Sequence, residues 1–277
     1  MHATYTFRAF SRFLAAALVI GLLGLKTVTA ASLNDTGVSQ CYNETNAPVS
    51  CSTAVGGDAG INPRQDARYG RDAAALAGSL IKVGAGSASF DYTKIANNGS
   101  TLAASATLGA NSTDWACTKD NVTGLVWEVK TTSGLRNNAH TYTWYSTNNT
   151  TNGSNAGVVG TNTCGGSLAA APYNNQCNTQ NYVAAVNASG GLCGATDWRL
   201  PSLRELRTLV HSGLTDPSAP SIDSAYFPNT SADVYWTRTS NASDTSRVRA
   251  LWFYLGFTVN SYVKTESRMT KLVRGAM

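Results

Sequence analysis

Few residues of this chain could carry out catalysis. Beyond the first thirty residues there are two histidines, His140 and His211, and no HExxH, GxSxG, phosphate-loop or paired CxxC pattern accompanies them. Zinc hydrolases, serine hydrolases and nucleotide-binding enzymes therefore lack their minimum residue sets. An isolated histidine is usually a surface or core residue, so the sequence predicts a protein that is not an enzyme.

The first thirty residues predict where the protein works. Arg8 and Arg12 precede an apolar run over 13–25, and small residues follow around Ala30, which is the pattern of a secretory signal peptide. The run is short for a bilayer span and no other long apolar run follows it, so no transmembrane segment is expected. We expect residues 1–30 to be a signal peptide and the mature protein to be periplasmic, on the cell surface or extracellular.

The six cysteines all follow this segment: Cys41, Cys51, Cys117, Cys164, Cys177 and Cys193. An even number of cysteines in an oxidising compartment predicts three disulfides, which leave no thiol to act as a nucleophile. The sequence alone does not determine the pairing. Cys41–Cys51 and Cys164–Cys177 are favoured because they close short loops, and Cys117–Cys193 because it would join an opening strand to the segment before a helix.

Positive charge gathers toward the C-terminus. The chain has 21 Lys+Arg against 16 Asp+Glu, but Arg8, Arg12 and Lys26 lie in the expected signal peptide, so most of the excess is absent from the mature protein. Six basic residues are the candidate contacts for an anionic ligand: Arg238, Arg247, Arg249, Lys264, Arg268 and Lys271. A loop over 240–249 and a turn after Val259 could bring these charges together, whereas a scattered solvated surface would give the same composition.

The clearest predicted element is a helix that begins at Ser202. Pro201 cannot continue a strand, Ser202 can accept a hydrogen bond from the first helical turn, and Glu205 completes a capping box three residues later. Apolar residues recur at helical spacing while arginines face elsewhere, and Gly213 can end the element. We expect a helix over 202–211 with one core face and one basic face.

The rest of the chain alternates short strands and helices. Strands are expected at 124–130, 141–145, 234–239, 250–259 and 270–275, and a second helix at 181–188. Before these, helical composition at 67–78 and a strand at 89–95 are followed by turn-forming residues over 97–112. The pattern predicts an α+β domain over 114–277 behind a partly ordered N-terminal extension over 31–113.

Several of these segments together resemble one protein family. They are DWRLPSLRELRTLVHSGL (197–214), CTKDNVTGLVWEVK (117–130), YWTRTS (235–240), ALWFYLGFTV (250–259) and KLVRG (271–275). In order and spacing they resemble the Lcl C-terminal domain family, formerly a domain of unknown function and now named after a collagen-like adhesin. The resemblance implies a C-type-lectin-like fold, in which a twisted, disulfide-tied antiparallel sheet is flanked by two helices.

The resemblance also bears on function. RLPSLREL is similar to a helix of formylglycine-generating enzymes, which share that superfold but use reactive cysteines in a C-terminal motif, and this chain has no cysteine after Cys193. The namesake adhesin binds sulfated glycosaminoglycans as a trimer. The resemblance therefore implies a non-catalytic, adhesin-like module that binds an anionic extracellular glycan or a surface protein, with a homo-oligomer as an open alternative.

Two further alternatives stay open. The chain could instead be a structural or assembly component of an envelope or fibre complex, and nucleic acid is not an expected partner in either case. No cofactor is expected, although Asp120, Asn121, Asp223 and Asn229 could supply oxygen ligands to calcium, which many lectin-like domains bind. These residue types more often form turns, and the EPN-, QPD- and WND-type motifs of calcium-binding lectins do not occur in the sequence.

Overall fold

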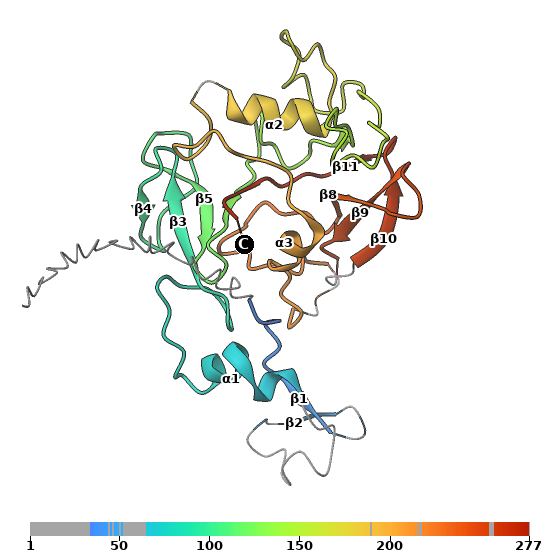
Figure 1. The fold of residues 1–277 in the computed structure, drawn as a ribbon. Coiled ribbons are helices and arrows are strands. Elements are labelled where there is room, and N and C mark those ends of the chain that lie inside the picture. The colour runs from blue at the N-terminus through green and yellow to red at the C-terminus, as the bar shows by residue number, and fades with distance from the viewer. Residues whose placement is uncertain are drawn as a thin grey trace, which may run out of the picture. The chain divides into compact units, whose positions relative to one another are not determined.

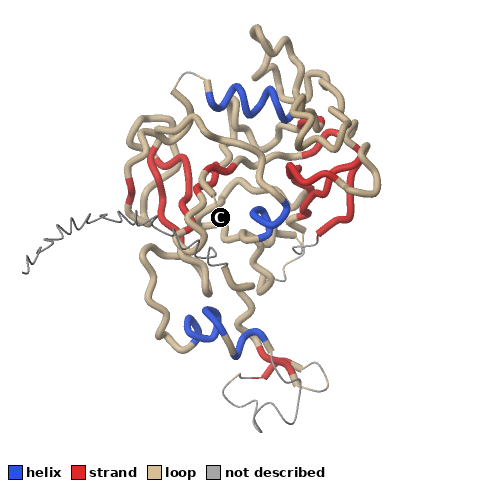
Figure 2. The backbone as a smooth tube through the Cα atoms, viewed as in Figure 1, coloured by secondary structure: helices blue, strands red, loops and turns tan. Residues whose placement is uncertain are grey.

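The computed structural model describes residues 34–43, 45, 47–49, 51, 65–188, 190–214, 216, 218–254 and 258–276. The described part is a mixture of short helices and antiparallel strand pairs, and long loops connect them (Figures 1 and 2). The expected signal peptide, residues 1–30, lies outside the described residues. No described helix has the length and apolar character needed to cross a membrane.

The largest sheet has five strands in the order β12-β6-β5-β3-β4. Its members are β3 (Tyr92–Ala96), β4 (Thr101–Leu102), β5 (Trp115–Asp120), β6 (Val126–Glu128) and β12 (Val273–Arg274). Neighbouring strands are antiparallel, with Ile95 opposite Cys117 and Val273 opposite Trp127. Segments that are far apart in the sequence therefore form one sheet.

The expected domain boundary at 113/114 cuts through this sheet. β3 lies before that position and pairs along its length with β5, which lies after it. Phe90 and Tyr92 are buried in the same core cluster as Trp127 and Leu206. The residues after Ala30 belong to one compact unit, so the turn-forming segment 97–112 connects paired strands and does not separate two domains.

A second sheet contains β8 (Val234–Ser240), β9 (Arg247–Trp252) and β10 (Thr258–Val263) in the order β10-β9-β8. The single strand expected over 250–259 is two strands, because β10 pairs antiparallel with β9 and places Thr258 opposite Leu251. Residues 255–257 between them lie outside the described residues. An apolar run fits one buried strand and a buried hairpin equally well, so its pattern did not distinguish them.

The remaining elements are short. β1 (Cys41–Tyr42) pairs with β2 (Pro48–Val49), and β7 (Tyr142–Thr143) pairs with β11 (Ser267–Arg268). A 3-10 helix covers Asp66–Arg68, and the α-helices are α1 (Gly70–Leu76), α2 (Thr179–Asn187) and α3 (Leu203–Arg207). The helices expected at 67–78, 181–188 and 202–211 therefore form, each with shifted ends.

α3 begins where the sequence predicts and ends sooner. The Ser202 hydroxyl accepts from the Glu205 amide at 3.2 Å and the Glu205 carboxylate accepts from the Ser202 amide at 2.7 Å, so the capping box is complete. The helix ends at Arg207 because the amides of the next three residues donate to carbonyl oxygens three residues back, in place of the four of an α-helix. The His211 amide then donates outside the helix, to Ser221 O at 2.9 Å.

One hydrophobic cluster joins both sheets and α3. Tyr92 and Trp127 from the five-stranded sheet, Leu206 from α3, and Tyr235 and Leu251 from the second sheet are all buried in it. Burial of such large side chains supplies most of the favourable free energy of folding. α3 is therefore held at a fixed place against both sheets.

The described residues form three disulfides: Cys41–Cys51, Cys117–Cys193 and Cys164–Cys177. They are the same three pairs that the sequence favoured. The second one joins β5 to the loop that leads into α3, across a sequence separation of 76.

Candidate functional site

Two of the six basic residues proposed as ligand contacts are buried. Lys264 is 1% exposed and Lys271 is fully buried. The Lys264 ammonium donates to Asn152 O at 2.8 Å and to Asn155 O at 2.6 Å, and it lies 4.3 Å from the centroid of the Trp144 ring. Lys264 therefore anchors the polar loop after β7 and does not face solvent.

Lys271 belongs to a buried group of charges around Glu128. Its ammonium donates to Glu128 O at 3.3 Å and lies 5.0 Å from the Phe227 ring centroid, and burial lowers the pKa of Lys271 to about 7. Burial alone would raise the pKa of Glu128, but Lys130 at 3.1 Å and the Tyr182 hydroxyl hold it below its ordinary value. Neither buried lysine can reach a surface ligand, so both drop out of the candidate set.

The other four candidates differ in how free their guanidinium groups are. Arg247 forms an ion pair with Asp244 at 3.3 Å, and Arg268 forms one with a neighbouring glutamate. Arg249 is half-buried and Arg238 is exposed, and neither takes part in an ion pair of the described chain. A paired arginine must give up a carboxylate before it binds another anion, so Arg238 and Arg249 are the stronger candidates.

Two arginines that the sequence-based set left out are better placed. Arg204 and Arg207 lie one turn apart on α3, both are exposed, and neither takes part in an ion pair of the described chain. They line a cleft of about 550 Å³, here called the α3 cleft, whose other wall residues are Asn34, Ser202, Leu203, Thr208 and Thr239. The signal for them was present in the sequence as the basic face of the capped helix.

Arg238 lines a second cleft of about 290 Å³, here called the β8 cleft. Hydroxyl, amide and aromatic side chains form much of its wall: Trp144, Tyr145, Ser146, Asn148, Thr151, Thr179 and Gln180. The two clefts adjoin, because the Arg238 amide donates to Pro201 O at 2.8 Å and the Leu203 amide donates to the Thr239 hydroxyl at 3.0 Å. Arg238 of β8 therefore lines the β8 cleft, and its neighbour Thr239 lines the α3 cleft. In the segment before α3, Leu200 lines the β8 cleft and Ser202 lines the α3 cleft.

An internal clamp joins α3 to the segment after β12. The Arg199 guanidinium donates to both carboxylate oxygens of Glu205, at 2.7 and 2.9 Å, and also to Gly275 O at 2.7 Å. Burial alone would raise the pKa of Glu205, but Arg199 and the Ser202 amide bring it below its ordinary value. Glu205 therefore stays ionised and joins the capping box to Arg199, which lines the β8 cleft.

The α3 cleft has the chemistry of an anion site. A guanidinium carries hydrogen-bond donors in a planar fork that matches carboxylate, sulfate and phosphate oxygens. None of the residues that line the cleft is acidic, and three of them carry hydroxyl groups. The cleft can therefore bind an anionic group and hydrogen-bond to polar groups beside it.

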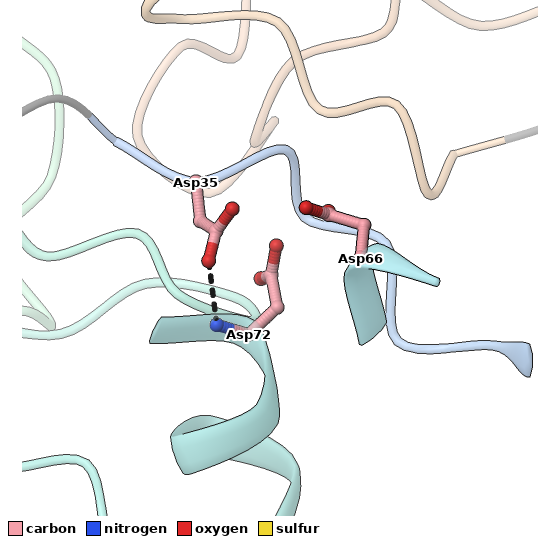
Figure 3. A group of neighbouring side chains, drawn as sticks. All are labelled: Asp35, Asp66 and Asp72. Atoms are coloured by element: carbon pink, nitrogen blue, oxygen red, sulfur yellow. Dashed lines mark hydrogen bonds between the residues drawn. The ribbon is translucent and has the colours of Figure 1, made fainter. Parts of the chain in front are cut away.

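Three of the residues considered for calcium are engaged in hydrogen bonds within the protein. Asp120 accepts hydrogen bonds from Asn34 and from a neighbouring threonine, Asp223 accepts from Ser87 at 2.8 Å, and Asn229 donates to a backbone oxygen. Among the described residues, acidic side chains gather in a group of three elsewhere, at Asp35, Asp66 and Asp72 (Figure 3). Neither histidine lines either cleft: His140 lies 3.5 Å from a serine hydroxyl, and His211 packs on an aromatic ring.

Comparison with protein families gives one match, which covers residues 116–274 and is the Lcl C-terminal domain. The match spans more than half of the chain, so the protein belongs to this family, and the resemblance seen in its motifs is confirmed. Comparisons with curated proteins and with solved structures give no match. Apart from Asn34, every residue that lines the two clefts lies within the family span.

Proposed function

We propose that the chain is an exported, non-catalytic binding module of C-type-lectin-like fold that recognises an anionic extracellular glycan. The observation that carries the proposal is the pair Arg204 and Arg207, two exposed guanidinium groups on a capped helix beside a cleft with no acidic wall residue. Arg238 extends this positive surface into the β8 cleft, where amide and hydroxyl groups match the hydroxyl groups of a sugar. Electrostatic attraction would bring the ligand in and the polar walls would orient it.

Other features support an exported and non-catalytic role. Three disulfides suit a protein that folds in an oxidising compartment. All six cysteines are joined in these disulfides, so none is a free thiol of the kind that a formylglycine-type enzyme uses. Antiparallel sheets with α2 and α3 inside the family span are compatible with the lectin-like fold that the family resemblance implies.

Binding to a defined heparin oligosaccharide tests the proposal. Arg204→Ala and Arg207→Ala should each weaken binding about tenfold, because each removes a charge-assisted contact of about 1.5 kcal/mol. Lys119→Ala is the matched control, since Lys119 is an exposed lysine on β5 outside both clefts, and should change affinity by less than about twofold. Titration calorimetry at two salt concentrations measures these affinities and their electrostatic component.

Two outcomes would contradict the proposal at different levels. Wild-type protein that leaves a heparin column at the same salt concentration as a protein of matched net charge would exclude an anionic glycan as the specific ligand. If Lys119→Ala weakens binding as much as Arg204→Ala and Arg207→Ala do, the result is compatible with an anionic glycan as ligand. It would show, however, that the glycan does not bind in the α3 cleft.

A further inference from the structure

A pocket beside α2 is separate from both clefts. Its volume is about 570 Å³, which suits a small molecule, and it shares no lining residue with the α3 cleft or the β8 cleft. Three segments line this pocket, here called the α2 pocket. They are 108–110 in the connection before β5, 131–136 after β6, and part of 185–192 at the end of α2.

The walls of the α2 pocket divide by polarity. The first and third segments contribute only apolar side chains and glycine, and Val186 and Leu192 also belong to the buried cluster that contains Cys117 and Cys193. Every polar side chain of the walls comes from 131–136, which supplies three hydroxyl groups and the guanidinium of Arg136. None of the lining residues is acidic. A ligand that matches these walls has an apolar body and a polar group at one side.

Arg136 carries a charge that is not neutralised by an ion pair of the described chain. Its Nη1 atom donates to Ala116 O at 3.1 Å and to Val129 O at 2.8 Å, which fixes the side chain. Among the described residues none accepts from its Nε or Nη2 atom, and this pair of donors matches the two oxygens of a carboxylate. Arg136 is half-buried, and a charge that has lost part of its hydration favours a counter-ion. The pocket therefore favours an anion.

We propose that the α2 pocket binds a small amphiphilic carboxylate, a fatty acid of medium chain length, with its head group on Arg136 and its hydrocarbon chain against the apolar walls. Charge complementarity selects the head group, and burial of the methylene groups supplies affinity. None of the lining residues lies in strands β1–β12, so an extended peptide would find no strand edge to pair with. This site goes beyond the glycan function and does not depend on it.

Calorimetric titration of the full chain with decanoate, below its micelle concentration, tests the pocket. We expect one saturable site with a Kd below about 1 mM. Hexanoate should bind at least about tenfold more weakly, because its shorter chain buries fewer methylene groups. Acetate lacks the apolar body and decyltrimethylammonium carries the opposite charge, so neither should bind saturably.

Two variants locate the site. Arg136→Gln removes the charge but keeps a donor for a backbone carbonyl, and it should weaken decanoate binding at least about tenfold. Ala110→Glu places a negative charge on the apolar wall at an exposed loop position, and it should weaken binding at least about fivefold while the fold is kept. Lys119→Gln and Ala104→Glu are the matched controls, because both positions are exposed and lie outside the pocket.

The outcomes separate the parts of the proposal. Circular dichroism and the melting temperature of each ligand-free variant establish that its fold is retained. A wild type that shows no saturable decanoate binding, or that binds decyltrimethylammonium as tightly, overturns the ligand class. Equal binding by the wild type and Ala110→Glu overturns the pocket, and equal binding by the wild type and Arg136→Gln overturns the head-group contact. No glycan is present, so these outcomes are independent of the function proposed for the α3 cleft.

Discussion

At the scale of single residues, Lys271 stands out because its amino group is enclosed by the core. It is fully buried, it contacts Glu128 O, and it lies over an aromatic ring. A protonated amine in this position loses its hydration, and the single carboxylate nearby is shared with Lys130. The protein therefore tolerates a destabilising group here, and the size of the destabilisation depends on pH.

The pH dependence of stability tests this interpretation. Burial lowers the pKa of Lys271 to about 7 in the folded chain, below its ordinary value of 10.5. Between these values the unfolded chain binds a proton that the folded chain does not, so this residue makes stability rise with pH. Lys271→Met should therefore stabilise the protein most below pH 7, and the gain should shrink by up to about 1.4 kcal/mol per pH unit above it.

Urea unfolding of the two proteins at pH 6, 7.5 and 9 measures the effect. Lys119→Met serves as the control, because Lys119 is an exposed lysine on β5 and the same replacement there removes no buried amino group. Stability curves of the wild type and Lys271→Met that run parallel over this range would show that Lys271 titrates normally.

At the scale of elements, α3 depends on contacts that come from distant parts of the chain. Its capping box is local, but the Arg199 clamp reaches Gly275 O, and the Cys117–Cys193 disulfide joins the preceding loop to β5. The Cys41–Cys51 disulfide, in contrast, ties the β1–β2 hairpin, and β1 also contacts the 3-10 helix. The two disulfides should therefore contribute differently to global stability.

Removal of each disulfide tests that difference. Paired replacement of Cys117 and Cys193 by alanine should cost about 4 kcal/mol, because it releases a long loop in the unfolded chain. Paired replacement of Cys41 and Cys51 should change global unfolding much less, because the hairpin can open while the five-stranded sheet stays intact. Thermal unfolding followed by near-ultraviolet circular dichroism measures both. Equal melting shifts would show that the hairpin is part of the cooperative core.

At the scale of the whole molecule, the five-stranded sheet extends beyond the family span. β3 and β4 precede it and form one side of the five-stranded sheet, and Phe90 and Tyr92 fill its core. A chain that begins at residue 114 would expose the edge of β5 and the apolar side chains beneath it.

Truncation tests the extent of the unit. A chain that begins at residue 80 should keep a cooperative thermal transition, whereas one that begins at residue 114 should lose it, because removal of β3 and β4 exposes large buried side chains. The chain from residue 31 is the reference. A cooperative transition of the shortest chain near the reference melting temperature would show that β3 is dispensable.

Local signals in the sequence were sufficient for some features and insufficient for others. The capping box at Ser202 was predicted because it depends on residue type and spacing, and the two short disulfide loops were favoured on the same ground. Cys117–Cys193 was favoured among pairings that the sequence left open. The pairing of β3 with β5 was not predicted, because the residues of a strand do not indicate which distant strand it pairs with. Composition also could not separate the buried Lys264 and Lys271 from surface arginines, because burial is decided by packing.

The nesting of one disulfide inside another has a consequence for how the protein matures. Cys164–Cys177 lies within the loop closed by Cys117–Cys193, so Cys117 does not bond to the next cysteine along the chain. A chain oxidised in the order in which it emerges would join Cys117 to Cys164 first. Reaching the native pairs from that state needs thiol–disulfide exchange, and its yield in a cell would depend on a disulfide isomerase in the compartment where the chain folds.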